Sequence, residues 1–115
     1  MTGPAQNDPI QTTLDALRAV RNHLYAIPGS TVAAMSLDDQ IKYGDNLQRI
    51  GTSILKLEAA KLQQVNQAFA AQQKALEDAS GKLQQATDRL NDSVQLIRVV
   101  GNSLSTITNI VSLLA

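Results

Sequence analysis

Cysteine and tryptophan are absent from this 115-residue chain, and Tyr25, Tyr43 and Phe69 are its only aromatic residues. Without cysteine the chain has no disulfide, no thiolate nucleophile and no cysteine-ligated metal, although this absence does not fix the cellular compartment. The only histidine, His23, cannot build an ordinary zinc site by itself, and a structural role for it is expected. We therefore expect no metal site and no cofactor.

A net charge of either sign is also missing, because ten basic and ten acidic side chains cancel. Nucleic-acid binding depends on basic clusters that face phosphates, so we expect no nucleic-acid partner. The first ten residues contain neither a positively charged stretch nor an apolar one, which indicates no secretory signal. The expected location is therefore the cytoplasm, or outside the cell after export without a classical signal peptide.

The last stretch of the chain, residues 99–115, carries no charged side chain. It is short for a membrane span and is interrupted by Gly, Ser, Thr and Asn, which argues against a membrane-spanning helix. Helices that rest on a membrane surface usually carry Lys or Arg on the polar face, and only Arg98 lies near this stretch. A membrane-active helical protein is therefore kept as a second alternative function.

Two carboxylate pairs, Asp38 with Asp39 and Asp88 with Asp92, are the groups that acid–base catalysis would use. Helix capping explains the first pair, and the second lies beside Arg89 on a Gln-rich face that we expect to be solvated. The glycines match neither a P-loop nor a Rossmann turn, and no EF-hand spacing is present. We therefore expect that the protein is not an enzyme.

Proline occurs only in the first 28 residues, and its positions delimit the first expected helix. Residues 1–8 are expected to be a disordered lead, after which Pro9 suits the first turn of a helix. Apolar residues then recur at every third or fourth position, which predicts a helix over residues 9–27 that ends at Pro28.

A loop over residues 30–35 is expected to separate this helix from a second one. Ser36 with Asp39 three residues later is close to a capping box, which predicts a helix start. From Leu37 onward the apolar pattern continues to the end of the chain, and after Leu62 its period approaches that of a coiled coil.

Two interpretations fit this long pattern: one helix of nearly eighty residues over 36–115, or a turn near Ser80 and Gly81. We favour the turn because antiparallel folding at this point sets apolar positions opposite one another, for example Leu76 against Leu83. It predicts helices over about 37–79 and 82–115.

The predicted fold is all-α, with one helical domain over residues 9–115. In this three-helix bundle with a coiled-coil arm, the short N-terminal helix packs on the base of a long antiparallel two-helix hairpin. A helix wedged between two neighbours needs a wide apolar surface, which accounts for the uncharged end of the chain. Gly44 and Gly51 are expected to admit a neighbouring backbone, and the expected core of the last helix contains Leu104, Ile107 and Val111.

The arm over residues 63–92 has few large apolar side chains, so two helices alone would bury little area there. This favours a non-enzymatic structural or interaction protein that acts through coiled-coil association, as a homo-oligomer or with a helical protein partner. The candidate interface residues follow the seam of the arm: Phe69, Leu76, Leu83, Leu90 and Ile97.

In length and in its polar, cysteine-free and tryptophan-free composition, the chain is similar to small helical subunits and substrates of bacterial secretion machines. This resemblance implies an alternative function as an exported filament subunit, effector or adaptor. The chain lacks the Trp-x-Gly turn of one such family, since its expected turn is Ser80–Gly81, and it lacks the proline-flanked turn of needle subunits. No residue role can therefore be carried over.

Overall fold

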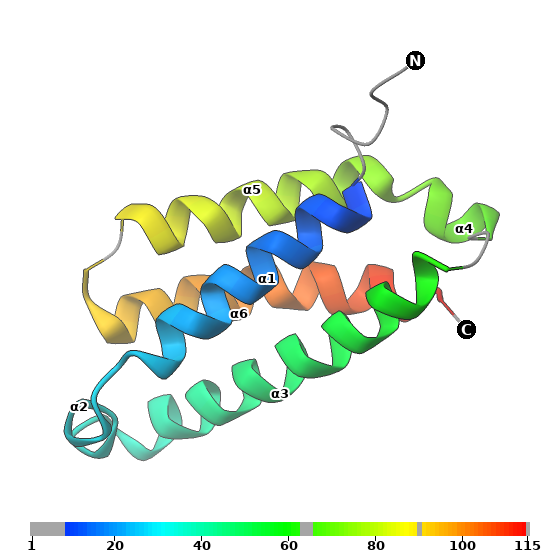
Figure 1. Cartoon of the computed structure of the whole chain (residues 1–115). Helices are drawn as coiled ribbons and strands as arrows, with labels where there is room; N and C mark the ends of the chain where they lie inside the picture. Colours follow the sequence, from blue (N-terminus) through cyan, green and yellow to red (C-terminus); the bar gives the residue numbers. More distant parts are fainter. Residues whose placement is uncertain (1–8, 63–65, 90, 115) are drawn as a thin grey trace.

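The computed structural model describes residues 9–62, 66–89 and 91–114, and every regular element in these ranges is a helix (Figure 1). The all-α prediction is confirmed. The helices are α1 (Pro9–Tyr25), α2 (Gly29–Ala33), α3 (Leu37–Ala60), α4 (Gln67–Ala70), α5 (Gln73–Arg89) and α6 (Ser93–Val111).

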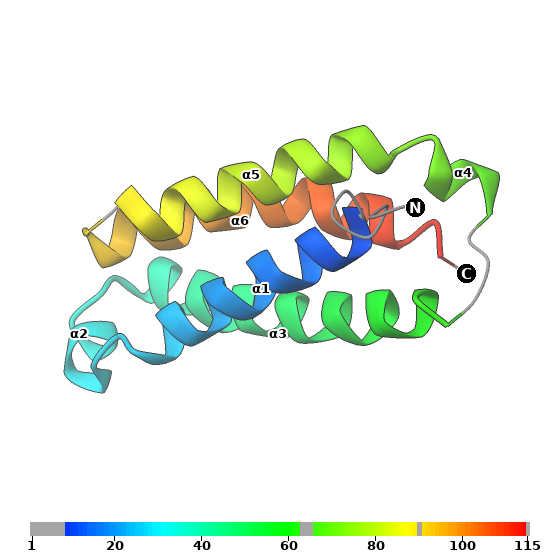
Figure 2. The same cartoon turned by 45° about the horizontal axis from the view of Figure 1, so that its top comes forward.

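The four long helices form an elongated bundle of 49 × 27 × 19 Å (Figures 1 and 2). The helices α1 and α3 run antiparallel as one pair, and α5 and α6 run antiparallel as the other. Between the pairs, α1 packs against α5 and α3 packs against α6. The short helix α4 lies at one end of the bundle and α2 at the other.

The predicted hairpin turn at Ser80 and Gly81 is wrong, because α5 runs through both residues. Leu76 and Leu83 therefore lie about two turns apart on one helix, and not opposite each other across a turn. A glycine inside a helix costs about 1 kcal/mol relative to alanine, which the burial of apolar side chains along one face of α5 outweighs. The predicted helices over 37–79 and 82–115 are replaced by α3, α5 and α6, and the single helix over 36–115 is also excluded.

The observed interruptions coincide with two polar N-cap residues, Asn66 and Asp92, whose capping role the sequence pattern did not predict. The Asn66 side chain accepts a hydrogen bond from the backbone N–H of Phe69 at 2.8 Å. Asp92 accepts from the N–H groups of Val94 and Gln95 at 2.9 and 3.1 Å. These bonds satisfy amide groups that lack a partner at a helix start, so new helices begin at α4 and α6.

The predicted starts of the first two long helices are confirmed: α1 begins at Pro9, and Ser36 caps α3. The Ser36 hydroxyl accepts from the N–H of Asp39 at 3.2 Å and donates to the carboxylate of Asp39 at 3.0 Å. The predicted loop over 30–35 is wrong for residues 30–33, which belong to α2. The expected lead over residues 1–8 lies outside the described residues.

The core consists of aliphatic side chains from the four long helices together with Phe69 of α4. Leu104, Ile107 and Val111 are buried as expected. The helix α6 packs against both α3 and α5, so it needs a broad apolar face. After Arg98 its exposed positions are uncharged but polar, and they include Asn102, Ser105, Thr106 and Asn109.

Gly44 and Gly51 do not admit a neighbouring backbone of this chain, so that expectation was wrong. A Cβ atom at either position would meet no atom of another element within 4 Å. The close approach is at Gly101 of α6, where a Cβ would lie 3.4 Å from Oδ1 of Asn46. The buried Asn46 donates to the carbonyl of Ile97 at 3.0 Å and so joins α3 to α6.

Candidate functional site

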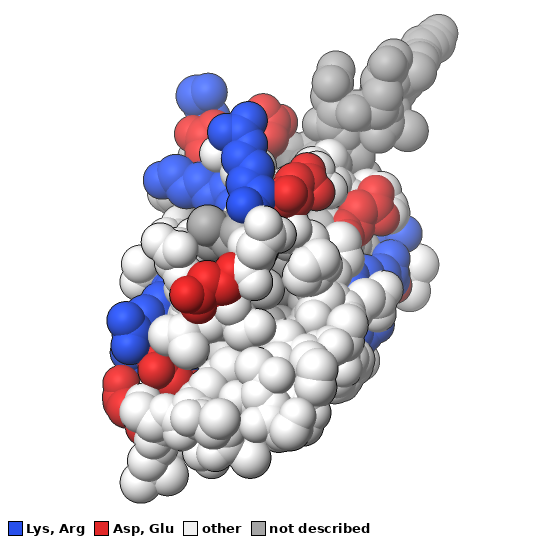
Figure 3. Space-filling view, turned by 90° about the vertical axis from the view of Figure 1, so that its left-hand side faces the viewer, with Lys and Arg blue, Asp and Glu red and all other residues white. Residues whose placement is uncertain are grey.

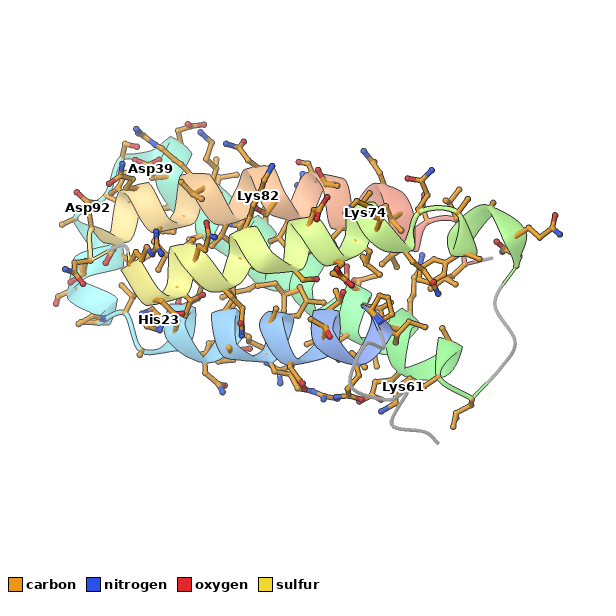
Figure 4. The ribbon with its side chains drawn as sticks, turned by 90° about the horizontal axis from the view of Figure 1, so that it is seen from above. His23, Asp39, Lys61, Lys74, Lys82 and Asp92 are labelled. Atoms are coloured by element: carbon orange, nitrogen blue, oxygen red, sulfur yellow. The ribbon has the colours of Figure 1, made fainter. Side chains whose placement is uncertain are left out.

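The titratable side chains labelled in Figure 4 come from different parts of the bundle and do not converge on one point. His23 and Asp92 lie near the α2 end, whereas Lys61 lies near the opposite end. In the described ranges, no group of three or more His, Asp or Glu residues is placed to hold a metal ion. Three of the four carboxylates considered for catalysis have structural partners: Asp38 pairs with Lys42 at 3.1 Å, Asp39 pairs with Arg98 at 3.3 Å, and Asp92 caps α6.

Asp39 is a charged residue that the fold buries, with 4 % of its surface exposed. Its carboxylate accepts hydrogen bonds from Nε and Nη2 of Arg98, both at 3.3 Å, and from Ser36. Burial alone raises the pKa of Asp39, but these bonds and the positive charges of Arg98 and Lys42 outweigh it, so the pKa lies below its ordinary value. The Asp39 carboxylate therefore links the start of α3 to α6 through its hydrogen bonds with Arg98.

A hollow of about 330 Å³ lies between α3 and α6, and its charged lining residues are already paired. Arg49 contacts Asp45 at 2.9 Å, and Arg98 contacts Asp39 outside the hollow at 3.3 Å. Lys42 is paired with Asp38. The hollow therefore offers a polar groove without an unpaired charge to fix a small anion.

The structure does not place the predicted interface residues at the surface. Phe69, Leu76, Leu83 and Ile97 are fully buried in the chain's own core, and Leu90 lies outside the described residues. A partner would reach the four buried side chains only if the bundle opened. Phe69 needs no second molecule to remove it from water, because the bundle itself covers this side chain.

The exposed apolar side chains gather instead along the outer face of α3. Leu37, Ile41, Leu55 and Leu62 are 73, 62, 73 and 87 % exposed. They belong to a set of uncharged positions, spaced three or four residues apart, that we call the α3 outer stripe. The stripe consists of Leu37, Ile41, Gly44, Gln48, Gly51, Leu55, Ala59 and, in the turn after the helix, Leu62.

The α3 outer stripe lies opposite the buried face of the same helix. At 100° per residue, its positions fall within about 40° of one line along the helix, and Asn46, Ile50 and Leu57 fall on the other side. Spacing of this kind, with apolar positions at 3.5-residue intervals, is typical of a helix that packs lengthwise against another helix. No helix of the described chain covers the stripe.

A charge-free surface also extends around the α2 end of the bundle. Residues 24–37 contain no charged side chain, and Tyr25 is 64 % exposed. In Figure 3 the lower part of this end, where α2 and the start of α3 lie, has no coloured side chains except at its edge. Leu37 belongs both to this end and to the α3 outer stripe.

Among the described residues, no helix has the length and apolarity needed to cross a membrane. Comparison of the chain with protein-family models, with curated proteins and with solved structures gave no match. The α3 outer stripe is therefore the feature of the molecule that bears most directly on function.

Proposed function

We propose that the protein is a non-enzymatic interaction protein that associates through the α3 outer stripe, with a second copy of itself as the partner. One observation carries the proposal. Four of the five large apolar side chains that the described structure exposes lie on this single uncharged stripe. Scattered exposed leucines are ordinary on a protein surface, whereas a contiguous apolar surface marks an interaction site.

Association would remove these side chains from water without changing the bundle. Burial of apolar area is worth roughly 25 cal/mol per Å², and the heptad spacing lets a second helix insert its side chains along the whole stripe. The core of the chain is already filled by its own residues. The surface that gains from a partner is therefore the outer one.

A helical partner fits the charges beside the stripe better than a membrane does. One flank of α3 alternates in sign through Asp38, Lys42, Asp45 and Arg49, and the chain has no net charge. Helices that bind membranes at the interface carry an excess of Lys and Arg on the polar face. Vesicles of anionic lipid are therefore expected to leave the protein in solution.

The test is the mass in solution over a range of concentrations. We expect light scattering at micromolar and higher concentrations to give a mass above the 12.3 kDa of one chain. A variant with Ile41→Gln and Leu55→Gln should shift towards the monomer while its melting curve at low concentration stays close to that of the parent, because both side chains are exposed. Tyr25→Gln, at an exposed apolar position outside the stripe, is the matched control.

Two results would contradict the proposal. The first is a monomer at every concentration up to several hundred micromolar. The second is an oligomer whose mass responds to Tyr25→Gln but not to the substitutions in the α3 outer stripe. Sedimentation of the protein with vesicles, lost in the Gln variant, would assign the stripe to a membrane surface.

A further inference from the structure

We infer that two copies of the chain pair their α3 helices antiparallel, about a twofold axis that passes between Gln48 and Gly51. This inference rests on the proposed function and specifies the partner surface. Residues whose numbers sum to about 99 then lie at the same level on the two helices. A closed twofold pair uses the same surface on both copies.

The order of large and small residues along the stripe supports this register. Leu55 of one copy meets Gly44 of the other, and the contact occurs twice by symmetry. Ile41 meets the small Ala59, and Gln48 meets Gly51. Because a Cβ atom at Gly44 or Gly51 would meet no atom of another element within 4 Å, each glycine leaves space at the surface for a side chain of the partner.

A parallel pair in register fits the same residues poorly. It would set Gly44 against Gly44 and Gly51 against Gly51, while Ile41 and Leu55 would each face their own copy. The large pairs would hold the helices apart and leave voids at the glycines. Voids and poorly filled contacts forfeit dispersion energy, so the antiparallel pair packs better.

The charges beside the stripe do not distinguish the two directions. In an antiparallel pair the same flank of both helices meets, which brings Asp45 of one copy near Lys56 of the other but also sets Arg49 beside Arg49. In a parallel pair the same Lys56 would lie near Glu58. Asp45 and Glu58 each already pair within their own chain, with Arg49 and Arg18. The fit of large and small residues therefore assigns the direction.

Disulfide trapping tests the direction of the pair, because the chain contains no cysteine of its own. Ile41→Cys and Ala59→Cys variants, one of them carrying a mass tag, are mixed and oxidised. The antiparallel pair brings Cys at 41 of one copy to Cys at 59 of the other. The two copies of position 41 lie roughly 26 Å apart along the axis, from a rise of 1.5 Å per residue.

We expect the mixed disulfide to dominate, and Ile41→Cys alone to give no more dimer than Gln84→Cys, a control at an exposed position on α5. Disulfides of Ile41→Cys with itself in place of the mixed product would overturn the antiparallel pair and leave association through the stripe intact. Dimer mass in solution without trapping at either position would overturn the proposed register, and the response of that dimer to Ile41→Gln with Leu55→Gln would then decide whether the proposed function stands. A monomer would overturn both the antiparallel pair and the proposed function.

An exchange of large and small residues tests the register independently. Gly44→Leu should fill the space that Leu55 of the partner occupies and weaken the dimer about tenfold or more. Adding Leu55→Ala to Gly44→Leu should restore most of the lost affinity. Gly81→Leu, at another exposed helical glycine with open space around it, should leave the affinity unchanged. If Gly44→Leu leaves the affinity unchanged, or the double variant binds more weakly than Gly44→Leu alone, the register is wrong.

Discussion

The hydroxyl groups of Thr13 and Ser80 meet inside the bundle, with their oxygens 2.7 Å apart. Each is also within 2.8 Å of a carbonyl of its own helix, Pro9 for Thr13 and Leu76 for Ser80. Two hydroxyl protons must serve three short contacts, so one hydroxyl donates to the other, which donates to its carbonyl. This shared arrangement lets α1 and α5 bury two polar side chains with each retaining a partner.

Ile107 gives a direct test of the core at the level of one residue. It is fully buried on α6, so Ile107→Asp places an unpaired charge among apolar side chains. The free energy of unfolding should fall by roughly 3 kcal/mol or more. Thr106→Asp, at the exposed neighbouring position, should change it little. Urea unfolding of the two variants makes the comparison, and equal stability would place Ile107 outside the core.

Asp39 predicts how stability changes in acid. Because its pKa is lowered in the folded chain, its contribution is fully present above the ordinary carboxyl pKa of about 4 and is lost as the pH falls through the lower folded value. Asp39→Asn should be less stable than the parent at pH 7 and should lose less stability on acidification. Urea unfolding at pH 7, about pH 4 and about pH 2 measures both effects.

Arg98 supplies the matched pair of variants for this prediction. Arg98→Gln removes the guanidinium that holds the Asp39 pKa down, so the folded pKa should move back towards its ordinary value and less stability should be lost on acidification than in the parent. Arg89→Gln, at an exposed position of α5, should keep the parent profile. An identical acid profile for Arg98→Gln and Arg89→Gln would mean that Arg98 does not stabilise the Asp39 carboxylate.

At the level of the helix, local signals identified some boundaries and not others. Pro9 and Ser36 mark the starts of α1 and α3, because both act on the backbone directly beside them. The helix break was sought at Gly81, although α5 compensates for this glycine by burying one face. Asn66 was overlooked although it caps α4, and its Nδ2 also donates to the carbonyl of Leu113 at 2.7 Å. That second bond depends on tertiary structure, which no local pattern contains.

The α3 outer stripe could not be identified from the sequence for the same reason, because its exposure depends on tertiary structure. The apolar pattern that begins at Leu37 reads as one continuous stripe, which does not separate Ile41 from Ile50 and Leu57. The helix α3 carries apolar residues on two faces, and only the packing of α1 and α6 shows which face is inside. Sequence periodicity therefore identified the helix and could not distinguish its core face from its exposed one.

A substitution at Gly81 tests the continuity of α5. Gly81 is exposed inside the helix, and a Cβ atom there would meet nothing within 4 Å. Gly81→Ala should therefore raise the free energy of unfolding by about 0.5–1 kcal/mol. Thermal unfolding of this variant tests whether α5 is continuous at Gly81. A turn that required glycine at this position would make Gly81→Ala destabilising.

At the level of the whole molecule, the chain consists of two helical hairpins, residues 9–62 and 73–114, that pack side by side. Helices within a hairpin are close in sequence, whereas the contacts of α1 with α5 and of α3 with α6 join distant parts of the chain. The sequence patterns indicated antiparallel helices but paired the wrong ones, because every long helix offers an apolar face that could meet any other. Which faces meet is decided by their joint packing.

The division into two hairpins means that a cut between α4 and α5 removes no buried side chain, since Phe69 stays on the first fragment. Ala71 and Gln72 are exposed between α4 and α5, so a protease site placed there would be accessible in the folded state. After cleavage, the two fragments should remain together as a noncovalent complex, because the surfaces that α1 shares with α5 and α3 shares with α6 stay intact. Gel filtration should show one species in buffer and two in denaturant. Separation in buffer would mean that the tether, and not the packing, holds the halves in place.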